Sequence, residues 1–189
     1  SIILVRLDFN QNFISLLSFP RDLYVDITGD GGFDKLNAAY SGGGGNARVI
    51  ATVQRLTGEP IERFFNVDFN AFRSLVNDSG GIYLDIDRVY FNDNSGPGEN
   101  FEQINIKPGY QKLRGSDALD YVRFRKDGGS DFARQVRQQA FLAELKRASR
   151  SPRSADNIVD AIRRDAQTDL QKPKRLRQFL TIGLGTEQD

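Results

Sequence analysis

The stretch Tyr121–Gln139, which reads YVRFRKDGGSDFARQVRQQ, decides the interpretation of the fold of this 189-residue chain. The chain as a whole contains 26 basic and 25 acidic residues, so an excess of positive charge in one stretch is a local feature. The cationic side chains of the stretch are Arg123, Arg125, Lys126, Arg134 and Arg137. Arginine suits the binding of phosphate or carboxylate, because its planar guanidinium can donate two parallel hydrogen bonds to either group.

The spacing of these arginines indicates which of them share a face. Arg123 and Arg125 stand two apart, so in an extended segment both point to the same side. Arg134, Arg137 and Gln138 stand at i, i+3 and i+4, so on a helix they share one face. A short glycine-containing turn separates the two pieces. This pattern predicts a strand end and a helix start that converge on one multiply charged anion; the alternative is that the arginines on the helix face are solvated, or are paired with nearby acids.

Composition excludes several classes of chemistry. The chain has no Cys and no His, which excludes thiol nucleophiles, Ser-His-Asp catalysis and histidine-liganded zinc. A metal would therefore be a hard cation bound by oxygen, such as Mg²⁺, Mn²⁺ or Ca²⁺. The net charge of +1 argues against a general role in binding nucleic acid or membrane surfaces.

The length of the chain fits a single domain, residues 1–189. Hydrophobic residues make up 39% and charged residues 27%, as is typical of soluble globular proteins. No apolar run approaches the about 18 residues of a membrane span. The chain begins without Met in a strand-like run, residues 1–5, so we expect it to be a fragment of a longer protein.

Hydrophobic periodicity and turn residues predict strands and helices along the whole chain. An early β-hairpin is expected from the apolar runs 2–9 and 13–19. Further strands are expected at 23–27, 61–69, 82–91 and 101–106. Helices are expected to start at 34 and to cover 46–57, 70–78, 116–120, 131–148, 155–164 and 173–180. This mixture predicts the α/β or α+β class, with a central sheet between helical layers.

Two other stretches are candidate sites. Ser18–Asp22 (SFPRD) places the charged pair Arg21 and Asp22 at the end of a buried strand, where ligand sites form in layered α/β folds. The alternative is a local salt bridge or turn. Lys35 follows Asp34 directly before an expected helix, where the alternative is an N-cap beside an exposed lysine.

Four stretches, in this order, resemble the LytR–CpsA–Psr family of cell-wall ligases. They are SLLSFPRDLYVDI (Ser15–Ile27), DKLNAAY (Asp34–Tyr40), the VDF and GG elements at Val67–Phe69 and Gly80–Gly81, and GSDALDYVRFRKDGGSDFARQVRQQ (Gly115–Gln139). The resemblance covers about residues 1–150, with a helical part at 151–189. It implies a three-layer α-β-α sandwich around a central mixed β-sheet, with an apolar tunnel for a lipid.

The resemblance also implies an activity. Members of the family are mostly membrane-anchored, with the catalytic domain outside the cytoplasm at the cell envelope. They move a glycan, with its proximal phosphate, from a polyprenyl-pyrophosphate carrier to peptidoglycan, assisted by Mg²⁺ (possibly Mn²⁺). Alternative functions that use the same residues are hydrolysis of polyprenyl pyrophosphates, or a non-catalytic module that binds anionic lipid or glycan.

Site residues are carried over from the resemblance by motif position. The implied catalytic residues are Arg21, Asp22, Arg123 and Arg125. The implied pyrophosphate-binding residues are Arg21, Lys35, Arg123, Arg125, Arg134 and Gln138. Asp131 also matches a motif position, and the Asp residues that bind metal are expected upstream of Ser1. Such a site suits phosphoryl transfer, because fixed guanidinium groups stabilise the charge that develops on the phosphate oxygens.

Overall fold

The computed structural model describes residues 1–8, 11, 13–20, 22–27, 32–41, 43–93, 103–124, 131–170, 172–174 and 176–177. The described strands are β1 (Ile2–Asp8), β2 (Phe13–Phe19), β3 (Tyr24–Ile27), β4 (Gly32–Lys35), β5 (Phe65–Asn66), β6 (Ile82–Ile86), β7 (Tyr90–Asn92), β8 (Ile104–Ile106), β9 (Gly109–Leu113) and β10 (Gln167–Thr168). The helices are α1 (Ala38–Ser41), α2 (Gly45–Thr57), α3 (Phe69–Asp78), α4 (Gly115–Arg123), α5 (Asp131–Ala148) and α6 (Pro152–Asp165). In this part of the chain, no helix is both long enough and apolar enough to cross a bilayer.

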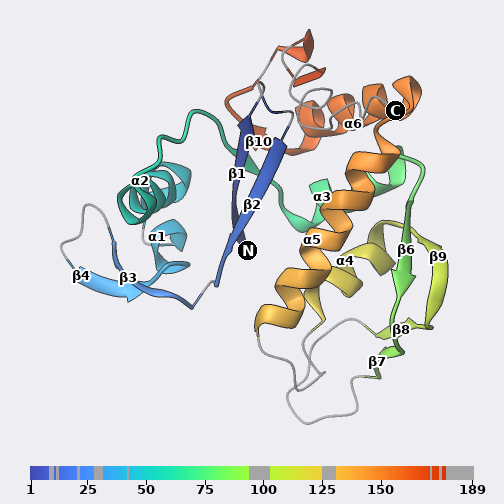
Figure 1. Ribbon diagram of the computed structural model, residues 1–189. Helices are drawn as coiled ribbons and strands as arrows, with labels where there is room; N and C mark the ends of the chain where they lie inside the picture. The colour runs from blue at the N-terminus through green and yellow to red at the C-terminus, as the bar shows by residue number, and fades with distance from the viewer. Residues whose placement is uncertain are drawn as a thin grey trace.

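The predicted early hairpin forms the middle of the molecule. β1 and β2 pair antiparallel, from Ile2 opposite Phe19 to Asp8 opposite Phe13. Figure 1 shows this hairpin between α1 and α2 on one side and α3 to α6 on the other. The end of β2 and the start of β1 therefore lie between the two helical groups.

The smaller hydrophobic cluster lies under the second hairpin, β3–β4. Its buried members are Phe19, Val25, Ile27, Leu36, Ala39 and Val53, and the hairpin residues Ile2 and Leu4 pack against them. The expected helix start at residue 34 is wrong, because residues 32–35 pair with β3 as a strand and the helix begins at Ala38. Lys35 thus lies on a strand, directly opposite Tyr24.

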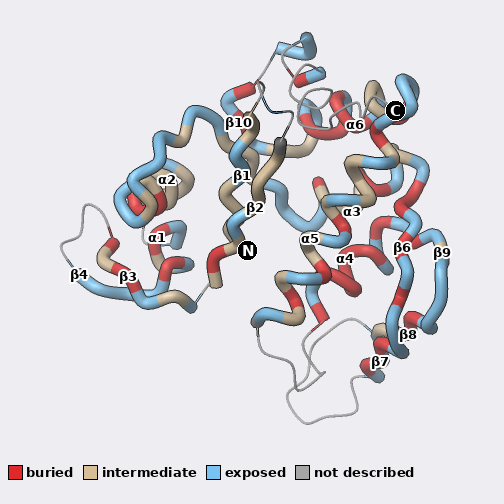
Figure 2. Tube along the Cα trace, in the orientation of Figure 1, coloured by how far each residue is buried: buried red, intermediate tan, exposed pale blue. Residues whose placement is uncertain are grey.

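The larger cluster joins α3, α4, α5 and α6 to the strands β6 to β9, where buried residues concentrate (Figure 2). Along β6, buried Ile82, Leu84 and Ile86 alternate with two exposed side chains, as expected for a strand with one face in the core. Gly115 lets α4 approach α3: a Cβ atom at this position would lie 2.5 Å from the carbonyl oxygen of Arg73. Only glycine fits there without movement of the backbone.

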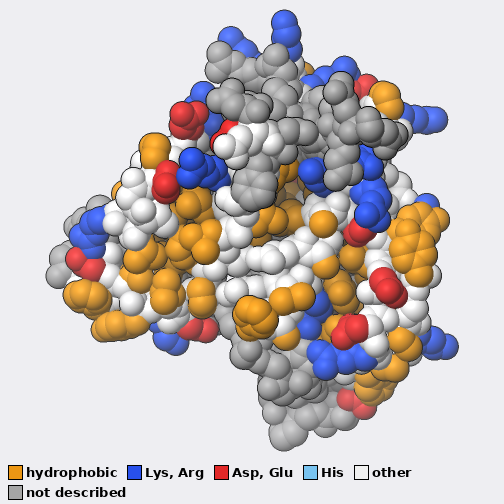
Figure 3. Space-filling model, in the orientation of Figure 1, with side chains coloured by type: hydrophobic (Ala, Val, Ile, Leu, Met, Phe, Trp, Pro, Cys, Tyr) orange, Lys and Arg blue, Asp and Glu red, His pale blue; other side chains and the backbone are white. Residues whose placement is uncertain are grey.

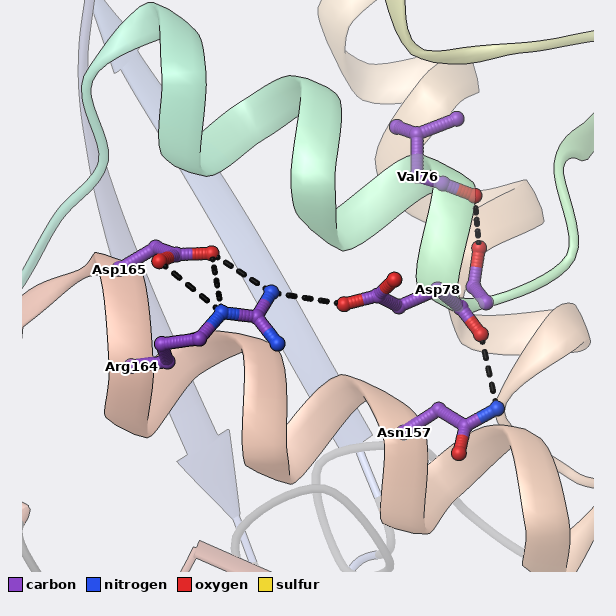
Figure 4. Close-up of polar contacts among 6 residues, drawn as sticks. Val76, Asp78, Asn157, Arg164 and Asp165 are labelled. Atoms are coloured by element: carbon purple, nitrogen blue, oxygen red, sulfur yellow. Dashed lines mark hydrogen bonds and ion pairs between the residues drawn. The ribbon is translucent and has the colours of Figure 1, made fainter.

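Polar contacts fasten α6 to the C-terminal end of α3 (Figure 4). Arg164 donates to Asp78 at 2.8 Å and to its neighbour Asp165 at 2.7 Å. Asn157 donates to the backbone carbonyl of Asp78 at 2.9 Å, and this carbonyl is one of those that a helix end leaves without an internal partner. Arg164 also lowers the pKa of the Asp165 carboxyl through their hydrogen bond.

The strand pairing differs from the single mixed sheet that we expected. All five hydrogen-bonded ladders within the described ranges are antiparallel pairs of two strands. One reason is that the predicted strand 82–91 is interrupted at residues 87–89, so β6 pairs with β9 whereas β7 pairs with β8. The predicted strand 61–69 shrinks to β5, and β9 was not predicted at all.

Candidate functional site

The N-terminal half of α5 ties the middle hairpin to the end of α4. Gln139 donates a hydrogen bond to the hydroxyl of Ser18 at 3.3 Å, and Gln138 donates to the hydroxyl of Ser1 at 2.8 Å. Gln138 also reaches the carbonyl oxygen of Val122 at 3.3 Å. Three segments far apart in the sequence thus meet here: the start of β1 and end of β2, the end of α4, and α5.

Arg123 is the last residue of α4, so the extended conformation that we predicted for it is wrong. The helix ends because Phe124 leaves helical geometry, with φ −50° and ψ 139°. Arg123 is exposed, and its guanidinium carbon lies 4.1 Å from the centre of the Phe69 ring. This cation–π contact orients the side chain while leaving its N–H donors at the surface.

Two further arginines of the cluster are buried in the first turns of α5. Arg134 is 6% exposed and Arg137 is 4% exposed. Arg137 donates to the carbonyl oxygen of Phe124 at 2.5 Å and lies over the rings of Tyr90 and Phe124, at 5.4 and 6.0 Å. Arg134 and Arg137 therefore lie on a buried face of α5 and not on a solvated one.

Gln138 has a side-chain oxygen available for a ligand. This Oε1 atom is buried and has no hydrogen-bond partner among the described residues. A buried polar oxygen without a partner costs about 1–3 kcal/mol, so a donor that enters the site would relieve a penalty. Ligand hydroxyl groups and protonated phosphate oxygens are donors of this kind.

Lys35, another residue that the sequence predicts for the site, lies at the end of β4. Its ammonium lies 3.5 Å from a carboxylate oxygen of Asp22, and both side chains are about half exposed, at 57% and 47%. Exposed ion pairs of this kind contribute only about 0–1 kcal/mol, so an anionic ligand can replace Asp22 as partner. Asp34 accepts from the backbone N–H of Lys35 at 2.6 Å, which is a local turn contact and not the helix cap of the alternative reading.

Some predicted site residues lie outside the described part of the chain. These are Arg21 and Arg125, and for Asp131 the backbone alone is described, as the first residue of α5. Arg21 follows Pro20, whose carbonyl accepts from the N–H of Leu23 at 3.1 Å. The turn from β2 to β3 therefore begins two residues after Ser18, which accepts the hydrogen bond from Gln139.

Tyrosines behind the arginines remain protonated at neutral pH. Burial raises the pKa of Tyr121 to about 12. Burial also raises the pKa of Tyr90, helped by the hydrogen bond of its hydroxyl to Asp87 at 2.5 Å. The two rings meet edge to face at 5.2 Å. Neither hydroxyl is a base at neutral pH, so their part is to form the wall against which Arg137 packs.

The described residues do not form a ready-made metal centre. Within the ranges given above, no group of three or more acidic side chains could hold an ion. Asp22 is the acidic side chain beside Lys35 at this site, and it takes part in that ion pair. Because Mg²⁺ requires near-octahedral oxygen ligation, the residues described here do not fit a Mg²⁺ site by themselves.

Sequence reasoning missed the residues that hold the site together. Ser1 and Tyr90 lie outside the motif stretches, and Ser18 and Gln139 lie within them but were assigned no role. Arg137 was counted in the cationic cluster but was not assigned to the site. The signal that could have indicated it is its place between Arg134 and Gln138 on one helix face.

The whole chain is similar in sequence to one protein family and to its characterised members. The sequence profile of the LytR_cpsA_psr family matches residues 1–188. The chain is 36% identical over 188 residues to the polyisoprenyl-teichoic acid–peptidoglycan teichoic acid transferase TagV of Bacillus subtilis (strain 168), covering 96% of this chain and 46% of TagV. It is 33% identical over 174 residues to the transferase TagU of Bacillus cereus, covering 90% of this chain and 54% of TagU.

Solved structures share the fold. The crystal structure of B. subtilis TagV superposes with a TM-score of 0.79 at 31% identity, covering 94% of this chain and 69% of that chain. TagT bound to LI-WTA superposes with a TM-score of 0.77 at 26% identity, covering 98% of this chain and 68% of that chain. This likeness confirms the predicted α/β class. The chain spans about half the length of the curated relatives that it matches.

Proposed function

We propose that this chain, which belongs to the LytR–CpsA–Psr family, transfers a glycan phosphate from a polyprenyl-pyrophosphate carrier to peptidoglycan. The observation that carries the proposal is the pair of hydrogen bonds from Gln138 and Gln139 to Ser1 and Ser18. These bonds bring the arginine-rich start of α5 to the end of β2, where the SFPRD stretch begins. This proximity of two distant segments supports the proposed anion clamp.

The chemistry follows from charge. An acceptor hydroxyl attacks the phosphorus that carries the glycan, a new P–O bond forms, and the bond to the polyprenyl phosphate breaks. The leaving phosphate takes the electron pair of that bond, and the hydroxyl proton passes to a base. Arg134, Arg123 and Lys35 are cationic side chains, so these groups stabilise the growing negative charge. Because Arg134 is buried, its field at the phosphate is screened less than that of a surface residue.

Further roles in the proposal come from motif positions. Arg21 and Arg125 complete the clamp, Gln138 supports it, and Asp22 takes a catalytic role beside Lys35. Mg²⁺ (or Mn²⁺) is part of the proposal because pyrophosphate oxygens can supply most of its ligands, together with one or two carboxylates. A lipid tunnel for the polyprenyl chain also remains a proposal.

We propose a location and an organisation for the protein as well. The full-length protein works outside the cytoplasm at the cell envelope, held by a membrane anchor, and residues 1–189 act as one catalytic domain. Fractionation of native cells tests the location, since a protein recovered in the soluble cytoplasmic fraction would contradict it.

The transfer itself is tested by incubating the full-length protein with a radiolabelled lipid-linked glycan, Mg²⁺ and peptidoglycan. Wild-type protein should move label into peptidoglycan, whereas Lys35→Ala and Arg123→Ala should lose about 10²- to 10³-fold in kcat, the range expected when a charge-stabilising donor is removed. Matched controls are Lys107→Ala and Arg163→Ala, which are exposed and lie away from the clamp. Release of free phosphorylated glycan would favour hydrolysis. Binding without turnover would favour a non-catalytic module.

A further inference from the structure

A pocket separate from the anion clamp lies between the β3–β4 hairpin and α2. Its volume is about 330 Å³. The hairpin contributes Tyr24, Val25, Asp26 and Phe33 to its wall, and α2 contributes Thr52, Arg55 and Leu56. Pockets for small ligands start at about 300 Å³, so this one has room for a ligand of one or two small rings.

The side chains of β3 and β4 that line the pocket and point away from the core lie on one face of the hairpin. Tyr24 and Asp26 stand two apart on β3, and Phe33 lies directly opposite Asp26 on β4. In an antiparallel pair, these positions share one face. Lys35 lies opposite Tyr24 and therefore shares that face too. Lys35, one of the proposed pyrophosphate-binding residues, is therefore a neighbour of Tyr24 on this face.

An aromatic pair forms one wall of this pocket. The rings of Tyr24 and Phe33 lie nearly parallel, with 23° between their planes and 6.0 Å between their centres. Both side chains are about two-thirds exposed, at 67% and 65%. Figure 3 shows hydrophobic side chains gathered at the surface over this hairpin. Open aromatic faces carry partial negative charge and attract the C–H bonds of a flat, partly apolar ring.

A charged pair of zero net charge lies beside the aromatic pair, because Asp26 shares its hairpin face and Arg55 reaches to it from α2. Arg55 is ion-paired with the carboxylate of Asp26 and donates to the backbone carbonyl of the same residue at 2.8 Å. Both side chains remain partly exposed, at 50% and 37%. The hydroxyl of Thr52 is already used, since it donates to the carbonyl of Arg48 at 2.8 Å. The polar wall therefore offers both donors and acceptors to a ligand but no excess of either charge.

From these walls we infer that the pocket binds a neutral pyranose sugar. A sugar ring presents C–H bonds on one face, which suit the Tyr24–Phe33 pair. Its hydroxyl groups both donate and accept hydrogen bonds, which suits Arg55 and Asp26. An apolar chain is disfavoured because it would remove water from this ion pair without replacing its hydrogen bonds. An anion is disfavoured because the carboxylate of Asp26 would repel it. Saccharide binding stands independently; that the sugar is the one next to the donor phosphate rests on the proposed function.

Saturation-transfer difference NMR tests the inference directly. The probes are N-acetylglucosamine and its β-1,4-linked disaccharide. When the wild-type protein is irradiated, saturation should pass to the ring protons of the bound sugar. Tyr24→Ala and Phe33→Ala should each weaken binding about five- to tenfold, as expected for the loss of one ring contact. Both positions are exposed, so the variants should keep the wild-type melting temperature.

A second pair of exposed tyrosines is the matched control. Tyr83 and Tyr110 stack at 5.4 Å with 16° between their planes, on β6 and β9, outside this pocket. Tyr83→Ala should leave saccharide binding unchanged. Equal losses in Tyr24→Ala and Tyr83→Ala would overturn the inference, and so would the absence of saccharide binding in the wild type.

The transfer assay separates this inference from the proposed function. Raised KM with unchanged kcat in Phe33→Ala would show that the sugar bound here belongs to the donor glycan. Full kcat/KM in Tyr24→Ala and Phe33→Ala, with wild-type transfer intact, would overturn the link to the donor while the proposed function stands. Saccharide binding by a wild-type protein that shows no transfer activity would support the saccharide pocket and contradict the proposed function.

Discussion

The side-chain amide of Gln138 lies 2.8 Å from the hydroxyl of Ser1, although 137 positions separate the two residues. The same amide reaches the carbonyl of Val122, one residue before Arg123. One helix side chain therefore sets the distance between the first strand and the end of α4. We expect the position of Arg123 relative to the first strand to depend on this contact.

Loss of this contact should reduce activity more than stability. In Gln138→Leu, the two donated hydrogen bonds and the buried acceptor oxygen disappear, and we expect kcat/KM for glycan transfer to fall about tenfold, since one charge-orienting contact contributes roughly 1–2 kcal/mol. Gln54→Leu, a partly buried glutamine of α2, is the control. Unchanged transfer kinetics in Gln138→Leu would show that the contact does not position the clamp.

Arg137 should prove to be a positioning residue. Arg137→Met removes a buried charge that holds the Phe124 carbonyl, and we expect about 2 kcal/mol lower stability, from the range for hydrogen bonds to charged groups. Urea unfolding measures this loss. Arg147→Met is the control, because Arg147 is exposed and pairs along its own helix with Glu144 at 3.0 Å.

A structural role alone would not alter catalysis in the folded fraction of Arg137→Met. We expect kcat to fall while KM changes less, because the Arg123 segment is displaced from the transition state and the substrate contacts elsewhere remain. Arg137→Lys should regain stability in part but not kcat, since an ammonium lacks the planar fork. Equal kcat for wild type and Arg137→Met would contradict this role.

Stability should fall at high pH because of Tyr121. Its pKa is raised to about 12 in the folded state, above the ordinary value of 10.0, so the folded state retains this proton more strongly than the unfolded state. The contribution is fully present below pH 10 and is lost between about pH 10 and 12, where the unfolded chain gives up the proton first; two pKa units correspond to about 2–3 kcal/mol.

Unfolding in urea at pH 8 and pH 11 measures this slope. Tyr121→Phe should show a smaller decrease between the two pH values than the wild type. The exposed Tyr110→Phe provides the comparison, because its side chain is 68% exposed. An identical decrease in wild type and Tyr121→Phe would assign the effect to other groups.

The contact between α3 and α4 should not tolerate a methyl group at residue 115. Gly115→Ala would place a Cβ 2.5 Å from a backbone oxygen of α3, and overpacking of this kind costs about 1–3 kcal/mol. Gly32→Ala is the control, since a Cβ at that position has no atom within 4 Å among the described residues. Thermal unfolding compares the two, and equal melting temperatures would mean that the helices can separate without cost.

Removal of divalent metal should stop transfer without unfolding the protein. Because the proposed transfer uses Mg²⁺, we expect EDTA to abolish it. The described residues lack a metal-binding cluster, so the melting temperature of the ligand-free protein should stay unchanged. Addition of Mg²⁺ or Mn²⁺ in excess should restore the activity. Full activity in EDTA would contradict the proposed role of the metal.

Much of the local structure could be predicted from the sequence. Apolar runs around a polar turn predicted β1 and β2, and the 3.6-residue period predicted α5 over residues 131–148. Errors came where long-range pairing outweighed local preference. Lys35 is in a strand because β3 lies beside it, and Arg123 is helical because α4 continues three residues beyond the predicted end. Residues 61–69 have few partners for a strand, and only two of them pair with β10.

The sequence by itself determined the chemistry of this protein: no cysteine or histidine, and one arginine-rich stretch at the start of a helix. Spacing along a helix showed that Arg134, Arg137 and Gln138 share a face. Only the tertiary structure decided that this face is buried and that it reaches Ser1, because burial and contacts across 137 positions depend on how distant segments pack. The same packing brings Tyr24 and Phe33 of the hairpin and Arg55 of α2 to one pocket, which local spacing does not predict.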